Sequence, residues 1–176
     1  MATTNRAVDA HAHVFCGAEF PFSPDTLYTP HPSQMGTPAK FRAVLAAHGR
    51  THGLLVGAGP YTHDNRCMLK AIAESDGHFK GIGVVKATAS ERELAELKAQ
   101  GVVGIRMNLM GHGMRPLTEP GADKLLAHLK VLDMFLQLHF QKDELVEAAL
   151  TLRRSGVRLM IDHFGRPDIA RGVKSA

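Results

Sequence analysis

The stretch Val102–Phe140 decides the fold, because it reads VVGIRMN (102–108), then a helical pattern of leucines at Leu125, Leu126 and Leu129, then FLQLHF (135–140). Two short apolar runs on either side of an amphipathic helix indicate parallel strands joined by a helical crossover. The same alternation predicts six strands in all: Ala7–Phe15, Leu54–Ala58, Gly81–Ala87, Val102–Asn108, Phe135–Phe140 and Arg158–His163.

Strands that alternate with helices in this way form either a doubly wound sheet or a (β/α) barrel. Six strand–helix steps favour the barrel. A complete eight-step barrel needs about 250 residues, whereas this chain has 176. We therefore expect an α/β fold, a TIM-type (β/α)8 barrel truncated after about six β/α units, with residues 1–176 forming one incomplete domain.

Composition excludes several classes of protein. The chain is 44% hydrophobic and 22% charged, with a net charge of +4, which is typical of a globular domain. Its Lys and Arg are scattered and it has two Tyr and no Trp, so nucleic acid is not expected as a partner. No stretch approaches the ~18 apolar residues of a membrane span, and the N-terminus resembles no leader. We expect a cytoplasmic protein that acts on a small anionic substrate and has the potential to form a homo-oligomer.

Two further features concern the first part of the chain. Cys16 and Cys67 show no metal-site or disulfide-framework spacing, so we expect free thiols and a reducing compartment. The segment Cys16–Pro38 holds five of the nine prolines and is too long for an ordinary loop, which indicates a lid or an ordered excursion over the site.

Candidate functional side chains gather at the ends of predicted strands. His11 and His13 share one face of the first strand, and His139 and His163 end two later strands. The carboxyl ends of the strands are where barrels of this type place catalytic groups. The alternative for the first pair is an exposed edge strand with two solvated imidazoles, and for the other two an ordinary core or loop position.

Arginine and amide side chains accompany these histidines. Arg106 and Asn108 share one face of GIRMN, where a guanidinium suits a carboxylate and an amide suits a carbonyl. Arg166, just beyond His163, is a second candidate anchor. Both arginines have a plain surface position as their alternative, with an ion pair to Asp168 in the case of Arg166. The sequence contains no G-x-S-x-G, Walker A or G-x-G-x-x-G motif, so those enzyme classes have no support.

Several of these motifs occur in an order that resembles a known family. VDAHAHVF, FPFSPDTLYTP, DNR, GIRMNLMG and IDHFGRPD follow one another along the chain. Together they are similar to the amidohydrolase superfamily, in the branch of 2-pyrone-4,6-dicarboxylate lactonase and related sugar-lactone hydrolases. The resemblance runs from Val8 to Asp168 and implies a barrel that hydrolyses a carboxylated lactone, with a role in aromatic degradation.

The resemblance also implies roles for individual residues. His11 and His13 would polarise the carbonyl, Arg106 would bind a substrate carboxylate, and His163 would help to hold the attacking water. His139 matches a fifth-strand position on the substrate side, and Asn108 and Arg166 add to the binding set. Two departures are visible: no strand-eight aspartate base is present, and His112 stands where the branch has a second arginine, for which Arg115 is a substitute.

Metal dependence is the open chemical question. The resemblance favours a reaction without metal. The alternative is a mononuclear zinc-dependent amidohydrolase or decarboxylase that uses His11, His13 and His139 as ligands. A non-catalytic truncated fragment is the alternative from a different functional class.

Overall fold

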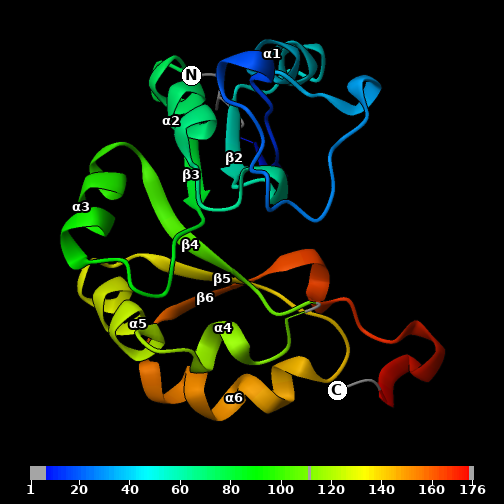
Figure 1. Ribbon diagram of the computed structural model, residues 1–176. Helices are drawn as coiled ribbons and strands as arrows, with labels where there is room; N and C mark the ends of the chain where they lie inside the picture. Colours follow the sequence, from blue (N-terminus) through cyan, green and yellow to red (C-terminus); the bar gives the residue numbers. More distant parts are fainter. Residues whose placement is uncertain (1–6, 111, 175–176) are drawn as a thin grey trace, which may run out of the picture. The chain divides into compact units, whose positions relative to one another are not determined.

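All six predicted strands are present in the computed structural model, which describes residues 7–110 and 112–174 (Figure 1). The strands are β1 Val8–Ala12, β2 His52–Val56, β3 Phe79–Gly83, β4 Val102–Asn108, β5 Phe135–His139 and β6 Arg158–Ile161. The helices between them are α1 Pro38–Ala47, α2 Arg66–Ala73, α3 Glu91–Ala99, α4 Arg115–Thr118, α5 Ala122–Val131 and α6 Glu144–Ser155. Residues 1–6, on which the expectation about a leader rested, and Gly111 of the GIRMNLMG motif lie outside the described residues.

Contacts divide the chain into two compact units, Met1–Val84 with Gln100–Val102, and Val85–Ala99 with Val103–Ala176. In the first unit β1 pairs with β2 and β2 with β3, all parallel. The α1 ring of Phe41 lies against Phe79 of β3, with ring centroids 5.3 Å apart. Gly53 of β2 permits this approach, because a Cβ there would lie 2.6 Å from the Phe41 ring.

The second unit repeats this arrangement with β4, β5 and β6, again all parallel. Arg106 of β4 is in register with Gln137 of β5, and Gln137 is in register with Met160 of β6. Helix α5 packs on β5 and is flanked by α3, α4 and α6. Ile105, Leu136 and Leu138 are fully buried and form the apolar layer. The residues that alternate with them therefore face the opposite side of the sheet.

The bounds of β4 match the sequence prediction, whereas those of the other five strands differ from it, most of all in β1 and β3. The first strand ends at Ala12, and Phe15 donates its amide to Gly36 in the following segment instead. The third strand begins two residues earlier than expected, at Phe79, and ends at Gly83. Val84 then bonds through both backbone groups to the side-chain amide of Asn65, at 2.9 and 3.0 Å. In both places a polar group from another segment of the first unit replaces the neighbouring strand.

The prediction of free thiols was wrong, because Cys16 and Cys67 form a disulfide with Cα atoms 5.7 Å apart. The partners come from the segment after β1 and from the first turn of α2, 51 residues apart in sequence. Spacing alone could not reveal the pair, since it depends on how α2 returns to the carboxyl end of β1. The disulfide helps to anchor the segment that follows β1.

That segment is an ordered excursion within the first unit. Ser23 donates its amide to the carbonyl oxygen of Pro60, and the ring of Phe22 lies against Phe15 and Tyr61.

Among the described residues, no helix combines the length and apolar character that crossing a membrane requires.

We predict that replacing both cysteines, Cys16→Ser with Cys67→Ser, lowers the free energy of unfolding by about 2–4 kcal/mol, because the disulfide restricts a long loop of the unfolded chain. Urea unfolding of the two proteins measures the difference. The intact mass of the parent under denaturation should be two hydrogens below that of the reduced chain. Equal unfolding midpoints, or two titratable thiols in the native parent, would contradict the prediction.

Candidate functional site

The first unit brings together the two histidines that follow the start of β1. The Nε2 atoms of His11 and His13 lie 3.4 Å apart and their rings meet edge to face. His13 Nδ1 lies 2.8 Å from the carbonyl oxygen of Val56, at the end of β2. Because a carbonyl oxygen only accepts, this His13 nitrogen carries the proton and donates it. When the His13 ring is neutral, its Nε2 therefore presents a lone pair toward His11.

Neighbouring side chains fix the ends of β1 and β2. The Asp9 carboxylate accepts a hydrogen bond from the backbone amide of His11 at 3.2 Å, which shapes the strand. The Tyr61 hydroxyl accepts the amide of Cys16 at 3.0 Å, and burial raises the pKa of this phenol. Asp64 pairs with Arg66, which holds the pKa of the Asp64 carboxyl below its usual value. These residues support the loop and do not belong to the histidine pair.

The second unit gathers four of the predicted residues at the carboxyl ends of its strands. Asn108 ends β4 in register with His139, which ends β5. The ring of His139 lies 5.2 Å from that of His163, directly beyond β6. Arg106 lies two residues before Asn108 on the same face. Three predicted binding residues and the predicted catalytic His163 thus lie at the ends of three adjacent strands, and the roles of these residues stay predictions.

His139 is an uncharged base in this environment. Burial, and after it the charge of Arg106, lower the pKa of His139 from 6.5 to about 4, while Asp162 partly opposes them. Its side chain is buried, and Nε2 has no hydrogen-bond partner among the described residues. Gln137, two residues earlier on the same face, likewise buries an Oε1 without such a partner. Buried polar atoms of this kind are suited to meeting a ligand.

Asp162 is the residue that the sequence prediction missed. Its side chain is 3% exposed and its carboxylate accepts a charge-assisted hydrogen bond from Nη2 of Arg106. Its other oxygen lies 3.7 Å from Nε2 of His163. An aspartate after an apolar run usually belongs to a turn, so nothing in RLMID distinguishes it. The available signal was its position beside His163, at a strand end where two other polar residues converge.

A left-handed turn follows Asp162. His163, Phe164 and Arg166 have φ values of 48°, 55° and 43°, a region that residues other than glycine rarely adopt. The Arg166 amide bonds back to the carbonyl of His163, and the Arg166 carbonyl accepts the amide of Lys142. Strained backbone of this kind is concentrated at functional sites. The turn therefore sets the direction in which the His163 side chain leaves the backbone.

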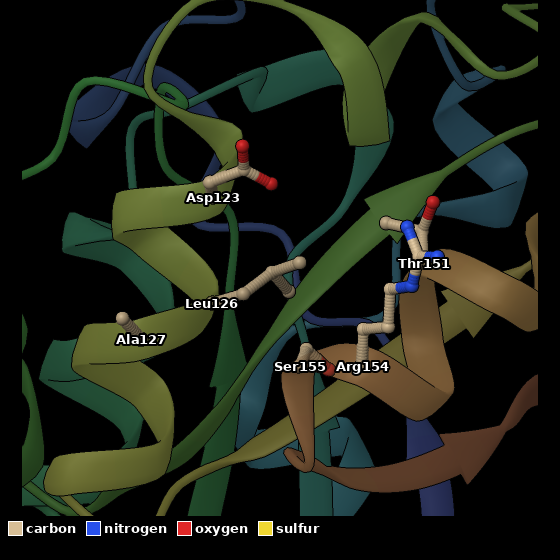
Figure 2. Close-up of a pocket in the computed structure, with 6 residues that line it drawn as sticks. All are labelled: Asp123, Leu126, Ala127, Thr151, Arg154 and Ser155. Atoms are coloured by element: carbon tan, nitrogen blue, oxygen red, sulfur yellow. The ribbon is translucent and has the colours of Figure 1, made fainter.

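Other candidates lie apart from these groups. His112 is exposed, and Arg115, the suggested second carboxylate anchor, begins α4 and pairs with Glu119 on the surface. A groove of about 360 Å³ on the outer helices α5 and α6 is shown in Figure 2. It is lined by Asp123, Leu126, Ala127, Thr151, Arg154 and Ser155, none of which was predicted to act in the site.

Comparison with known proteins supplies the family. The family model for amidohydrolases matches residues 8–176. This chain belongs to the amidohydrolase family. It is 32% identical over 170 residues to the 2-pyrone-4,6-dicarboxylate hydrolase of Comamonas testosteroni, covering 96% of this chain and 55% of the relative. It is 29% identical to the 4-sulfomuconolactone hydrolase of Hydrogenophaga intermedia, covering 94% of this chain and 54% of the relative.

Solved structures of amidohydrolases share the fold. A probable 2-pyrone-4,6-dicarboxylic acid hydrolase from Acinetobacter baumannii, with citric acid bound, superposes with a TM-score of 0.85 at 36% identity, over 94% of this chain and 61% of that one. A zinc-bound amidohydrolase from Burkholderia multivorans gives 0.73 at 16% identity, over 95% of this chain and 61% of that one, and shows the fold alone. The expected family and α/β barrel class are confirmed. This amidohydrolase spans about half the length of the curated relatives it matches.

We predict that the amidohydrolase loses stability as the pH falls from about 6.5 toward 4 because of His139. Its folded pKa of about 4 lies below the unfolded value of 6.5, so the contribution is complete above 6.5 and is lost as acid protonates the unfolded chain. The loss amounts to about 2–3 kcal/mol by pH 4.5.

Urea unfolding of the parent and of His139→Gln at pH 7 and pH 4.5 measures this loss. Between pH 7 and pH 4.5, the free energy of unfolding of His139→Gln should fall by about 2–3 kcal/mol less than that of the parent. His31→Gln, at an exposed position, is the control and should follow the parent. Parallel losses in the parent and His139→Gln would show that His139 is not the sensitive group.

Proposed function

We propose that this amidohydrolase chain opens a carboxylated lactone by attack of water. The supporting observation is the polar set of the second unit, where a largely buried guanidinium, Arg106, lies beside the neutral base His139 and the amide of Asn108. A guanidinium binds carboxylate through paired, charge-assisted hydrogen bonds. The names of the two curated relatives, both lactone hydrolases, point to the same class of substrate.

The proposed reaction uses few groups. Water adds to the lactone carbonyl carbon and the ring C–O bond breaks, leaving a carboxylate and a hydroxyl group. Arg106 binds a carboxylate of the substrate, and Asn108, His139 and Arg166 complete the binding set. His11 and His13 polarise the carbonyl, which stabilises the oxyanion that forms there. His163 holds the attacking water, a general base takes a proton from this water, and the proton passes to the ring oxygen as the C–O bond breaks.

The organisation of the protein is part of this proposal. We take residues 1–176 as one amidohydrolase barrel domain, incomplete relative to eight β/α units. Its partners are a small anionic lactone and a second copy of the chain, with no nucleic acid or membrane. A cytoplasmic location stays a prediction, and the disulfide of Cys16 with Cys67 removes the free thiols that had supported it.

Incubation with 2-pyrone-4,6-dicarboxylate tests the function directly, with loss of the lactone and gain of the ring-opened acid followed by chromatography.

We predict that Arg106→Met raises KM by roughly 10- to 100-fold with a smaller effect on kcat, since it removes a charge-assisted bond to the substrate. Arg92→Met, on the exposed side of α3, is the matched control. An unchanged KM in Arg106→Met would remove Arg106 from carboxylate binding, and absence of turnover in the parent would favour the non-catalytic alternative.

A second candidate function, a mononuclear zinc-dependent reaction, is favoured by the histidine pair. Two nitrogens bound to one tetrahedral zinc at ~2.0–2.1 Å lie about 3.4 Å apart, and the Nε2 atoms of His11 and His13 are separated by 3.4 Å. The bond from His13 Nδ1 to Val56 is the outer partner that a ligating imidazole usually has. His11 and His13 would hold the metal with His139 as third ligand, and a bound zinc lowers the pKa of water to about 7.

We predict for this alternative that the purified chain retains about one equivalent of zinc after dialysis, measured by elemental analysis. His11→Gln and His13→Gln should each lose most of it, while His52→Gln at the amino end of β2 should keep it. A metal content that is near zero in the parent, or equal in all four proteins, would argue for the reaction without metal.

A further inference from the structure

Asp162 carries a charge in a place that penalises charge. Its side chain is 3% exposed and that of its partner Arg106 is 11% exposed. A buried carboxylate is tolerated when a cation and hydrogen bonds compensate for the water it has lost. The pair also bridges one strand of the sheet. Arg106 lies on β4 and Asp162 follows β6, with β5 between them. A hydrogen bond from β4 to the end of β6 fixes the guanidinium of Arg106 relative to β5 and β6.

The same carboxylate approaches a second functional side chain. One oxygen accepts from Nη2 of Arg106, and the other lies 3.7 Å from Nε2 of His163. Asp162 is also the last residue before the left-handed turn, in which His163 has φ 48°. The position of His163 is therefore set from two sides, by the turn in its own backbone and by the neighbouring carboxylate.

We propose that Asp162 is a positioning residue, which orients the guanidinium of Arg106 for a substrate carboxylate and holds the imidazole of His163 beside it. The inference rests on the proposed function, because it concerns the residues assigned there to binding and to water. A guanidinium is a planar fork of five donors. Fixing one nitrogen of this fork on Asp162 fixes the plane in which the Arg106 donors meet a carboxylate. Preorganisation of this kind lowers the ordering cost of binding.

The contrasting role is purely structural, in which Asp162 only neutralises a buried arginine. The two roles differ in kinetics. A structural defect lowers the folded fraction, so the apparent kcat falls while KM for 2-pyrone-4,6-dicarboxylate is unchanged. A misplaced guanidinium raises KM in the folded molecules. Displacement of a substrate-holding group by about 1 Å costs up to ~10²-fold in rate.

The test is Asp162→Asn, which keeps the shape of the side chain and removes its charge. We expect a rise in KM of about tenfold. Asp133→Asn is the matched control, because Asp133 pairs with Arg158 at 2.9 Å at the amino ends of β5 and β6. This control should leave KM unchanged. A KM within about twofold of the parent in Asp162→Asn, with kcat reduced in proportion to the folded fraction, would overturn the proposal.

Two readouts that need no hydrolysis separate this proposal from the proposed function. The first is the NMR spectrum of the Arg106 guanidinium, whose Nη signals should be separate in the parent and averaged in Asp162→Asn. The second is calorimetric binding of citrate, a small tricarboxylate, which should weaken by about tenfold in that variant. Averaged Arg106 signals in the parent, or unchanged citrate affinity, would refute positioning even where turnover is normal. If the parent shows no turnover, the proposed function fails, and the guanidinium spectrum still decides the role of Asp162.

Discussion

The register between β4, β5 and β6 is the constraint on which the polar part of this amidohydrolase depends. Parallel pairing sets Arg106 beside Gln137 and Asn108 beside His139, while the alternate residues supply the apolar layer under α5. A shift by one residue would send the guanidinium into that apolar layer and the leucines to the polar side. The apolar layer and the polar face therefore depend on a single alignment, and burial of Leu136 and Leu138 is what secures the position of His139.

The alignment also explains how buried charge is accommodated here. Neither Arg106 nor Asp162 would be stable alone at its level of exposure. Each becomes tolerable because the ends of strands two apart in the sheet lie near one another. His139 responds in the opposite way. The surroundings that accept the ion pair lower its pKa, so this imidazole is uncharged at neutral pH. The face thus combines a compensated charge with a neutral base.

Much of this architecture could be predicted from the sequence, and for a physical reason. Short Val/Ile-rich runs between helices are typical of parallel strands, and β4, VVGIRMN, has the bounds that this pattern predicts. Strand-end polar residues were predictable because parallel strands bring their carboxyl ends to one edge, which applies to Asn108, His139 and His163. The remaining features depend on contacts between residues that are far apart in the sequence. The disulfide of Cys16 with Cys67 and the partnership of Asp162 with Arg106 join residues 51 and 56 positions apart, and no local pattern encodes them.

The left-handed turn after β6 limits which substitutions this chain can accept. At His163, Phe164 and Arg166 the backbone excludes β-branched side chains before any chemistry is considered, and it favours Gly, Asn, Asp and His. Substitutions here are therefore filtered twice, first by conformation and then by activity.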